Sequence, residues 1–182
     1  DPENPNALIT LARYRYLSGT SQLEQDPTTG QVGLTDESRQ EFEAAVEAWN
    51  RYLETDPAKP DVGTAGNMVQ AYYALNDPEG GATAQRIQAE ANPSAGTYTR
   101  LAFFEYASYN FKAADEAAKR ALAEAPKSET KALEKQLDQY REAAEKQKRQ
   151  LDKLPADSAT GEQALDSPFG ALDDGSTPPI AP

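Results

Sequence analysis

Apolar residues recur at intervals of three and four over positions 1–126, which is the spacing of one face of an α-helix. Three of these stretches close on a proline, a residue that does not continue a helix. They are AAVEAWNRYLETDP, ending at Pro57, GATAQRIQAEANP, ending at Pro93, and AADEAAKRALAEAP, ending at Pro126. A second apolar stretch precedes each one: ALITLARYRYLSG, AGNMVQAYYALND and YTRLAFFEYASYN. The pattern therefore predicts three consecutive helix pairs.

The three upstream stretches share a register, in which a large or apolar residue is followed by an aliphatic residue three positions later and then by a small or aliphatic one. These residues are Leu8, Leu11 and Ala12, then Ala65, Met68 and Val69, then Tyr98, Leu101 and Ala102. The last closing helix is rich in alanine, at Ala114, Ala117, Ala118 and Ala121. Such small side chains let two helix backbones approach closely, and Leu101 or Phe104 from the neighbouring helix would fill the remaining space.

This pattern resembles the tetratricopeptide repeat family, in which a large residue, Leu-Gly and Tyr are followed by Ala, an aromatic residue and a closing Pro. The matching residues of the last unit are Tyr98, Leu101, Ala102, Ala114, Ala121, Leu122 and Pro126, and those of the first are Leu8, Leu11, Ala12, Gly19, Ala45, Trp49 and Pro57. The middle unit keeps Tyr72 but has Gly81 and Gln85 where alanine and an aromatic are usual. The resemblance implies an all-α solenoid with units at about 1–59, 60–94 and 95–126.

Two segments depart from the repeat. An insertion at 20–40 contains Asp26-Pro27-Thr28-Thr29-Gly30, which is typical of a turn, and then Thr35, a good helix N-cap. We expect a loop around 26–34 between two lengthened helices, serving either as a solvent loop or as a docking loop. Asp1-Pro2 occupies the place held later by Asp56-Pro57, so we expect a helix before Asp1 and a longer native protein, for which an N-terminal anchor is one option.

The C-terminal third divides into a helix and a tail. Residues 127–154 predict a long charged helix with a narrow apolar stripe, which would cap the repeats or pair with another subunit as a coiled coil. The stripe consists of Leu133, Leu137, Tyr140, Ala144, Leu151 and Leu154. Residues 155–182 are an acidic stretch rich in Pro, Gly and Ser, as in a disordered or extended tail. Within the tail, Leu165, Phe169 and Leu172 form either a short linear motif or a segment that docks on the chain's own repeats, and a plain solvated tail is the favoured alternative.

Composition excludes several function classes. The net charge of −12 disfavours nucleic acid as a partner, and the longest notable uncharged run, 62–76, is too short to cross a bilayer. Cysteine and histidine are absent, which removes thiolate nucleophiles, serine-histidine relays and the usual zinc sites. The paired carboxylates show no sign of an apolar pocket, and GGATAQ at 80–85 lacks the lysine of a phosphate-binding loop. We expect no catalytic residues, no cofactor, no metal and no membrane insertion in this part of the chain.

The family resemblance implies that the first helix of each pair lines a concave surface that binds a peptide or protein segment. By register, the candidate residues are Ile9, Arg13, Tyr16, Leu17, Asn67, Gln70, Tyr73, Thr99, Arg100, Phe103 and Tyr106. Alternatively, Phe103 or Tyr106 would be buried against the capping helix. Asn67 and Arg100 fall where some family members grip a C-terminal carboxylate, but Ile9, Arg13 and Gly96 hold the other three places, so that activity is not predicted.

Three hypotheses about function follow. The first is a non-enzymatic protein–protein interaction module, and the second is a structural subunit of a larger or homo-oligomeric envelope assembly. The third is a chaperone-like accessory domain tethered beside a membrane machine. For localisation, the extracytoplasmic part of a membrane-anchored bacterial protein is favoured over a cytoplasmic scaffold.

Overall fold

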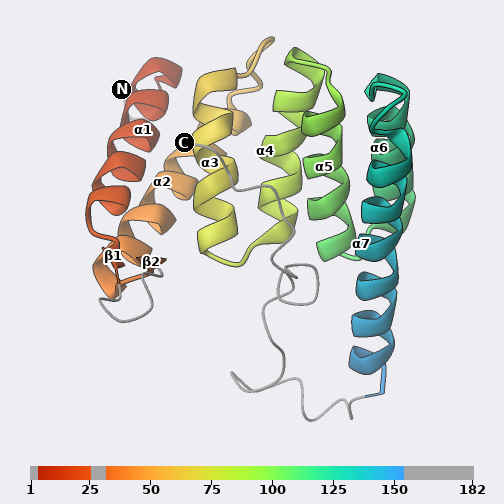
Figure 1. Cartoon of the computed structure of the whole chain (residues 1–182). Helices are drawn as coiled ribbons and strands as arrows, with labels where there is room; N and C mark the ends of the chain where they lie inside the picture. Colours follow the sequence, from red (N-terminus) through yellow and green to blue (C-terminus); the bar gives the residue numbers. More distant parts are fainter. Residues whose placement is uncertain (1–3, 26–31, 154–182) are drawn as a thin grey trace. The chain divides into compact units, whose positions relative to one another are not determined.

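The fold is all-α, as the periodicity predicts. The computed structural model describes residues 4–25 and 32–153, and that part of the chain holds seven α-helices and one short hairpin (Figure 1). The helices are α1 (Pro5–Ser21), α2 (Asp36–Glu54), α3 (Val62–Ala74), α4 (Pro78–Ala91), α5 (Ala95–Ala107), α6 (Phe111–Glu124) and α7 (Thr130–Leu151). The antiparallel hairpin pairs β1 (Glu24–Gln25) with β2 (Val32–Gly33) inside the 20–40 insertion. The sequence analysis did not anticipate this pairing.

Side-chain caps fix where several helices begin. The predicted cap at Thr35 is confirmed: its hydroxyl accepts a bond from the Ser38 N–H at 3.0 Å, and the Ser38 hydroxyl accepts from the Thr35 N–H at 2.8 Å. Ser94 and Thr97 form the same reciprocal pair at the start of α5. Asp61 caps α3 by accepting the Thr64 N–H at 2.7 Å. These bonds satisfy N–H groups that a helix leaves without partners in its first turn.

Helices α3 and α5 end in the same way. Asn76 and Tyr109 follow the two C-caps with φ of 60° and 58°, in the left-handed region. In each case two backbone N–H groups bond back into the last turn, from Asn76 and Asp77 in α3 and from Tyr109 and Asn110 in α5. Asn76 and Tyr109 are separated by the same number of residues as Ala65 and Tyr98. The structural ends therefore repeat in the register that the side-chain pattern suggests.

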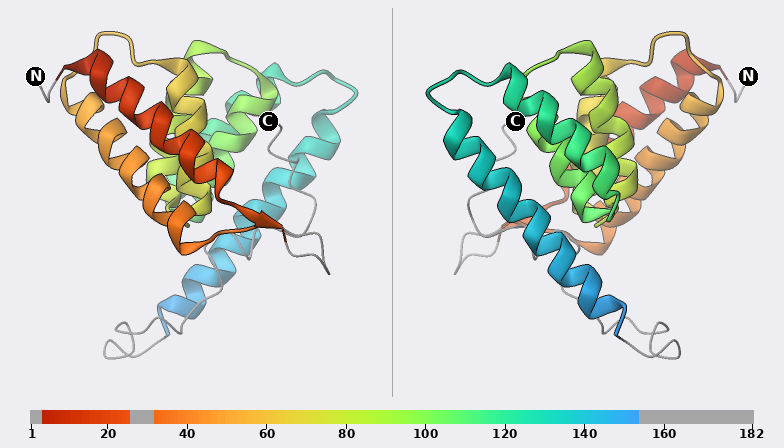
Figure 2. Two further views of the ribbon diagram at one scale, coloured as in Figure 1. Left: turned by 90° about the vertical axis from the view of Figure 1, so that its left-hand side faces the viewer. Right: turned by 90° about the vertical axis from the view of Figure 1, so that its right-hand side faces the viewer.

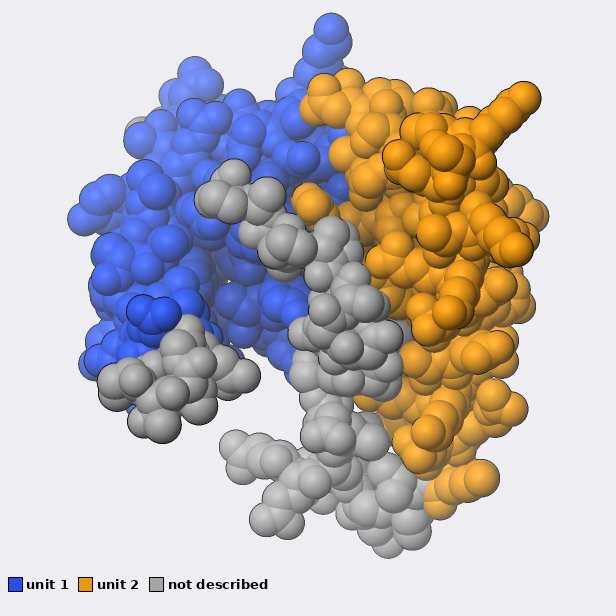
Figure 3. Space-filling view, viewed as in Figure 1, with its two compact units in different colours: residues 1–88 blue, residues 89–182 orange. Residues whose placement is uncertain are grey.

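The chain divides into two compact units, Asp1–Gln88 and Ala89–Pro182 (Figure 3). In the first unit α1 and α2 pair along their length, and α3 packs against both (Figure 2). Gly19 allows the close approach of α1 to α2, because a Cβ there would lie 2.9 Å from the Phe42 ring. Helix α4 contacts α3 in this unit, where Gln88 Nε2 donates to the Val62 carbonyl at 2.7 Å. The core includes Leu8, Ala12, Ala45, Trp49 and Met68, each at most 2% exposed.

In the second unit α5 and α6 pair, and α7 packs against both. Ala114, Ala117 and Ala121 of α6 are buried, and so are Leu101 and Phe104 of α5, which agrees with the expected close approach of an alanine-rich helix to large neighbours. Leu137, Tyr140 and Ala144 of the predicted α7 stripe are buried as well, while Leu133 and Leu151 are half-buried. Each unit thus contains a helix pair with a third helix across it.

Some expectations lie outside the described residues. These are Asp1-Pro2, most of the loop around 26–34, Leu154 and the tail with Leu165, Phe169 and Leu172. Among the described helices, none combines the length and apolar character needed to cross a bilayer.

Candidate protein-binding surface

The first unit carries seven of the eleven candidate binding residues, on two helices that contact each other. Ile9, Arg13, Tyr16 and Leu17 belong to α1, and Asn67, Gln70 and Tyr73 belong to α3. We call these seven residues the α1–α3 surface.

Arg13 ties the two helices of this surface together. Its Nε donates to Thr64 Oγ1 at 2.8 Å, and its Nη2 donates to Asp61 Oδ1 at 2.7 Å. Asp61 therefore serves both as the cap of α3 and as the anion that holds Arg13. The Arg13 side chain is still 47% exposed, so it lies at the surface while its orientation is fixed. A fixed guanidinium loses little further freedom when it binds a carboxylate.

The ionisation of Asp61 matches this role. Burial by itself raises the pKa of the carboxyl group, but hydrogen bonds from Thr64 and Arg13, together with the Arg13 charge, outweigh it and leave the pKa below its usual value. Asp61 therefore remains a carboxylate at neutral pH.

The rest of the α1–α3 surface is uncharged. Leu17 is 64% exposed, and Ile9, Tyr16, Asn67, Gln70 and Tyr73 are half-buried. Tyr16 rests on the Phe42 ring with centroids 5.8 Å apart, which fixes its ring against α2. The combination of apolar side chains, two amides and one fixed arginine suits a peptide that brings apolar side chains and a carboxylate.

In the second unit, the expectation that Thr99, Phe103 and Tyr106 are exposed is wrong. Phe103 is 5% exposed and meets Tyr140 of α7 edge to face, with centroids 5.3 Å apart. Tyr106 is 2% exposed, and Thr99 is also buried, with its hydroxyl donating to the Ala95 carbonyl. The physical reason is that α7 packs on the face of α5 that the repeat pattern left open. Of the candidates in this unit only Arg100 keeps partial exposure.

The register shows why this occurred. Counting from Leu8 and Tyr98, Phe103 takes the place of Arg13, and both are contacted by the third helix of their own unit. Arg13 bonds to α3, whereas Phe103 packs on α7. The alternative expectation, burial under the capping helix, holds for Phe103, which packs on Tyr140 of α7. Tyr106 is also buried, and it contacts Asp115 and Phe111 of α6.

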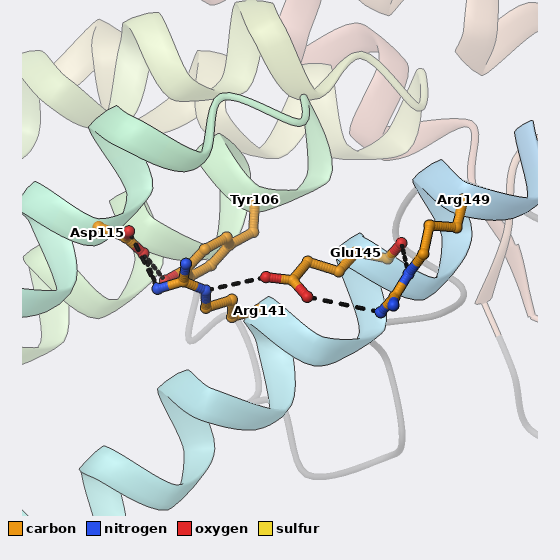
Figure 4. Close-up of polar contacts among 5 residues, drawn as sticks. All are labelled: Tyr106, Asp115, Arg141, Glu145 and Arg149. Carbon is orange, nitrogen blue, oxygen red and sulfur yellow. Dashed lines mark hydrogen bonds and ion pairs between the residues drawn. The ribbon is translucent and has the colours of Figure 1, made fainter. Parts of the chain in front are cut away.

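A polar network joins α5, α6 and α7 on the second unit (Figure 4). Tyr106 donates to Asp115 Oδ1 at 2.7 Å, and Arg141 Nη1 bonds both oxygens of Asp115 at 3.1 Å. Arg141 Nε also donates to Glu145, which forms an ion pair with Arg149. Burial and the neighbouring Asp115 raise the pKa of Tyr106, so its hydroxyl stays protonated and remains a donor. No sequence pattern indicates this network, because Asp115 and Arg141 lie far apart along the chain.

Two large α1 side chains are exposed, and only for Leu11 does this depart from the expected environment. Leu11, which the repeat pattern places in a packing position, is 40% exposed, and Tyr14, which the sequence analysis did not single out, is 66% exposed. The available signal was that α1 has apolar residues on two opposite faces. Among residues 4–25 and 32–153, no group of acidic side chains is arranged to hold a metal ion.

No family model matches this sequence, and no curated protein does either. The resemblance to tetratricopeptide repeats therefore rests on the residue pattern and on the repeated helix ends at Asn76 and Tyr109.

Proposed function

We propose that the chain is a non-enzymatic protein-binding module of the tetratricopeptide-repeat kind, and that the α1–α3 surface binds a segment of a partner protein. The observation that carries this proposal is that Arg13 is fixed but exposed, on a pair of contacting helices that also present exposed Leu17 and half-buried Tyr16 and Tyr73. Exposed apolar and aromatic side chains around an oriented arginine are the composition of binding hot spots. The repeated helix ends at Asn76 and Tyr109 support the family assignment.

The surface favours a particular ligand chemistry. An arginine guanidinium has five N–H groups in a planar fork, and Arg13 directs some of them to Thr64 and Asp61. A partner carboxylate that approaches from solvent would add a charge-assisted bond to the same side chain. The ligand we propose is a short segment with apolar side chains and one carboxylate.

Selection from a random peptide library tests this proposal. Peptides that bind the native chain are then titrated against a double variant, Asn67→Glu with Gln70→Glu, which adds two negative charges to the α1–α3 surface. We expect the double variant to bind at least about 10-fold more weakly, because charge repulsion and desolvation oppose an acidic ligand.

The matched control is Gln40→Glu with Gln139→Glu. It adds the same charge at exposed positions of α2 and α7, and it should leave affinity unchanged. Equal weakening by both double variants, or a failure to select any peptide, would count against the proposal.

A further inference from the structure

One face of α1 carries apolar side chains that no described residue of its unit covers. Among the described residues, four large hydrophobic side chains are exposed, and three of them are Leu11, Tyr14 and Leu17 of α1. The buried side of the same helix, at Leu8, Ala12 and Gly19, faces α2. Figure 2 (left view) shows α1 at the front of its unit. We call Ala7, Thr10, Leu11, Tyr14, Leu17, Ser18 and Ser21 the outer α1 face.

Equivalent positions in the other first helices are buried. In the shared register, Leu11 and Tyr14 correspond to Met68 and Ala71 of α3, both 0% exposed. They also correspond to Leu101 and Phe104 of α5, which are 7% and 1% exposed. The outer α1 face therefore has the side chains of a packing surface. A helix with apolar residues on two opposite faces is normally buried on both.

The outer α1 face carries no charge, although 26% of the residues in the chain are charged. Two of its hydroxyl groups donate within the helix, Thr10 to the Asn6 carbonyl and Ser21 to the Ser18 carbonyl, each at 2.7 Å. The Ser18 hydroxyl accepts a bond from Gln22 at 3.2 Å. The two arginines of α1 are directed elsewhere: Arg13 bonds Asp61, and Arg15 bonds Glu41 at 3.0 Å. Covering this face would therefore bury no charged group, and the Thr10 and Ser21 hydroxyls would keep their acceptors.

The order of residues on this face reads nearly the same in both directions from Tyr14. Leu11 and Leu17 lie three positions to either side, Thr10 and Ser18 lie four, and Ala7 and Ser21 lie seven. A two-fold axis requires a self-complementary patch, because each residue meets its mirror position on the other copy. Two antiparallel copies of α1 centred on Tyr14 would place each Leu11 against a Leu17, with small residues at both ends where the helices approach.

We propose that the outer α1 face is a homodimer interface, formed by antiparallel packing of α1 against α1 of a second copy of this chain. Neutrality favours a second copy as occupant, because two chains of net charge −12 can meet there without opposing like charges. The proposal does not rest on the proposed peptide binding. Leu17 lies at the border of the two surfaces, so Tyr14 is the decisive position.

Sedimentation equilibrium of the native chain over a range of concentrations tests the dimer. We expect a reversible dimer with a dissociation constant below about 1 mM, since one helix pair forms a small interface. Tyr14→Glu should weaken it about 100-fold or more, because the two-fold axis brings the two introduced charges together. Val32→Glu is the matched control, since Val32 has nearly the same exposure but lies in the hairpin. Added salt should change the dissociation constant of the native dimer little, because the outer α1 face carries no charge.

Cysteine cross-linking tests the antiparallel register and does not depend on Tyr14→Glu remaining folded. The chain has no cysteine, so Leu11→Cys and Leu17→Cys each introduce a single thiol. Under mild oxidation, a mixture of the two variants should form the mixed disulfide faster than either variant forms its own.

Three results would overturn the proposal. They are a chain that stays monomeric at every concentration, equal weakening by Tyr14→Glu and Val32→Glu, and preferential Leu11→Cys self-pairing. A monomer that still binds peptides would separate failure of the dimer from failure of the proposed function.

Discussion

The Asp61 carboxylate accepts two bonds: one from the Thr64 N–H, which caps α3, and one from Arg13 of α1. Loss of the cap in Asp61→Ala should cost about 1 kcal/mol of unfolding free energy. In the folded state the pKa of Asp61 lies below the ordinary value of 3.8. The stability that the Asp61 charge contributes is therefore fully present above pH 3.8 and is lost as pH falls through the folded pKa. Asp61→Asn keeps an acceptor for the cap but has no charge.

Urea unfolding at neutral pH and near pH 3 measures this effect. The stability difference between the native chain and Asp61→Asn should shrink at the lower pH. Asp36→Asn, at an exposed first-turn position of α2, controls for general loss of carboxylate charge. If the stability difference between the native chain and Asp61→Asn does not change with pH, the Asp61 charge does not stabilise the fold as proposed.

Gly80 gives a second prediction at the residue scale. A Cβ at Gly80 would overlap the ring of Tyr72, whose hydroxyl is bonded to Asn50 at 2.7 Å. Alanine normally stabilises a helix by about 1 kcal/mol relative to glycine, but overpacking of this kind costs about 1–3 kcal/mol. Gly80→Ala should therefore lower the midpoint of urea unfolding. Gly63→Ala should not lower it, because its nearest neighbours would be 3.5 and 3.6 Å away.

At the scale of elements, an aromatic contact and a set of ion pairs attach α7 to its unit, and they contribute differently to the free energy of unfolding. The aromatic contact of Phe103 with Tyr140 is buried, whereas Arg141 is 47% exposed. Phe103→Ala should cost about 3–5 kcal/mol, while Arg141→Ala should cost less than about 1 kcal/mol because exposed ion pairs contribute little. Chemical denaturation of both variants tests the order, and Arg149→Ala provides a control at a more exposed position of the same network. If Arg141→Ala loses more unfolding free energy than Phe103→Ala, the polar network contributes more than the aromatic contact to the attachment of α7.

At the scale of the whole molecule, the excess of acidic residues sets the response to salt. With 30 acidic and 18 basic side chains, the folded chain repels itself more than the expanded chain does. Screening by salt relieves this repulsion, since the Debye length is about 10 Å at 0.1 M and longer below it. We expect thermal unfolding to shift to higher temperature between low salt and about 0.15 M NaCl. A downward shift would mean that the surface ion pairs outweigh the net repulsion.

The sequence by itself determined which segments are helical. Spacing of apolar residues, the Thr35 cap and the closing prolines are local features, and a helix forms from contacts within a few residues. The stretch expected from Ala113 forms α6 from Phe111, and the one expected from Ala65 forms α3 from Val62. Differences of a few residues at the helix ends are ordinary, because the first and last turns of a helix fray and the exact boundary is not sharply defined.

Only the tertiary structure decided which faces of those helices are covered. Phe103 and Arg13 occupy equivalent register positions, and the third helix of each unit contacts them differently. Phe103 packs on Tyr140 of α7 and is 5% exposed, whereas the Arg13 side chain bonds Thr64 of α3 and stays 47% exposed. Leu11 shows the converse, since a packing residue by pattern is partly exposed where no helix of its unit covers it. Periodicity determines the direction of a side chain relative to its own helix. Burial depends on a second element that lies far away in the sequence.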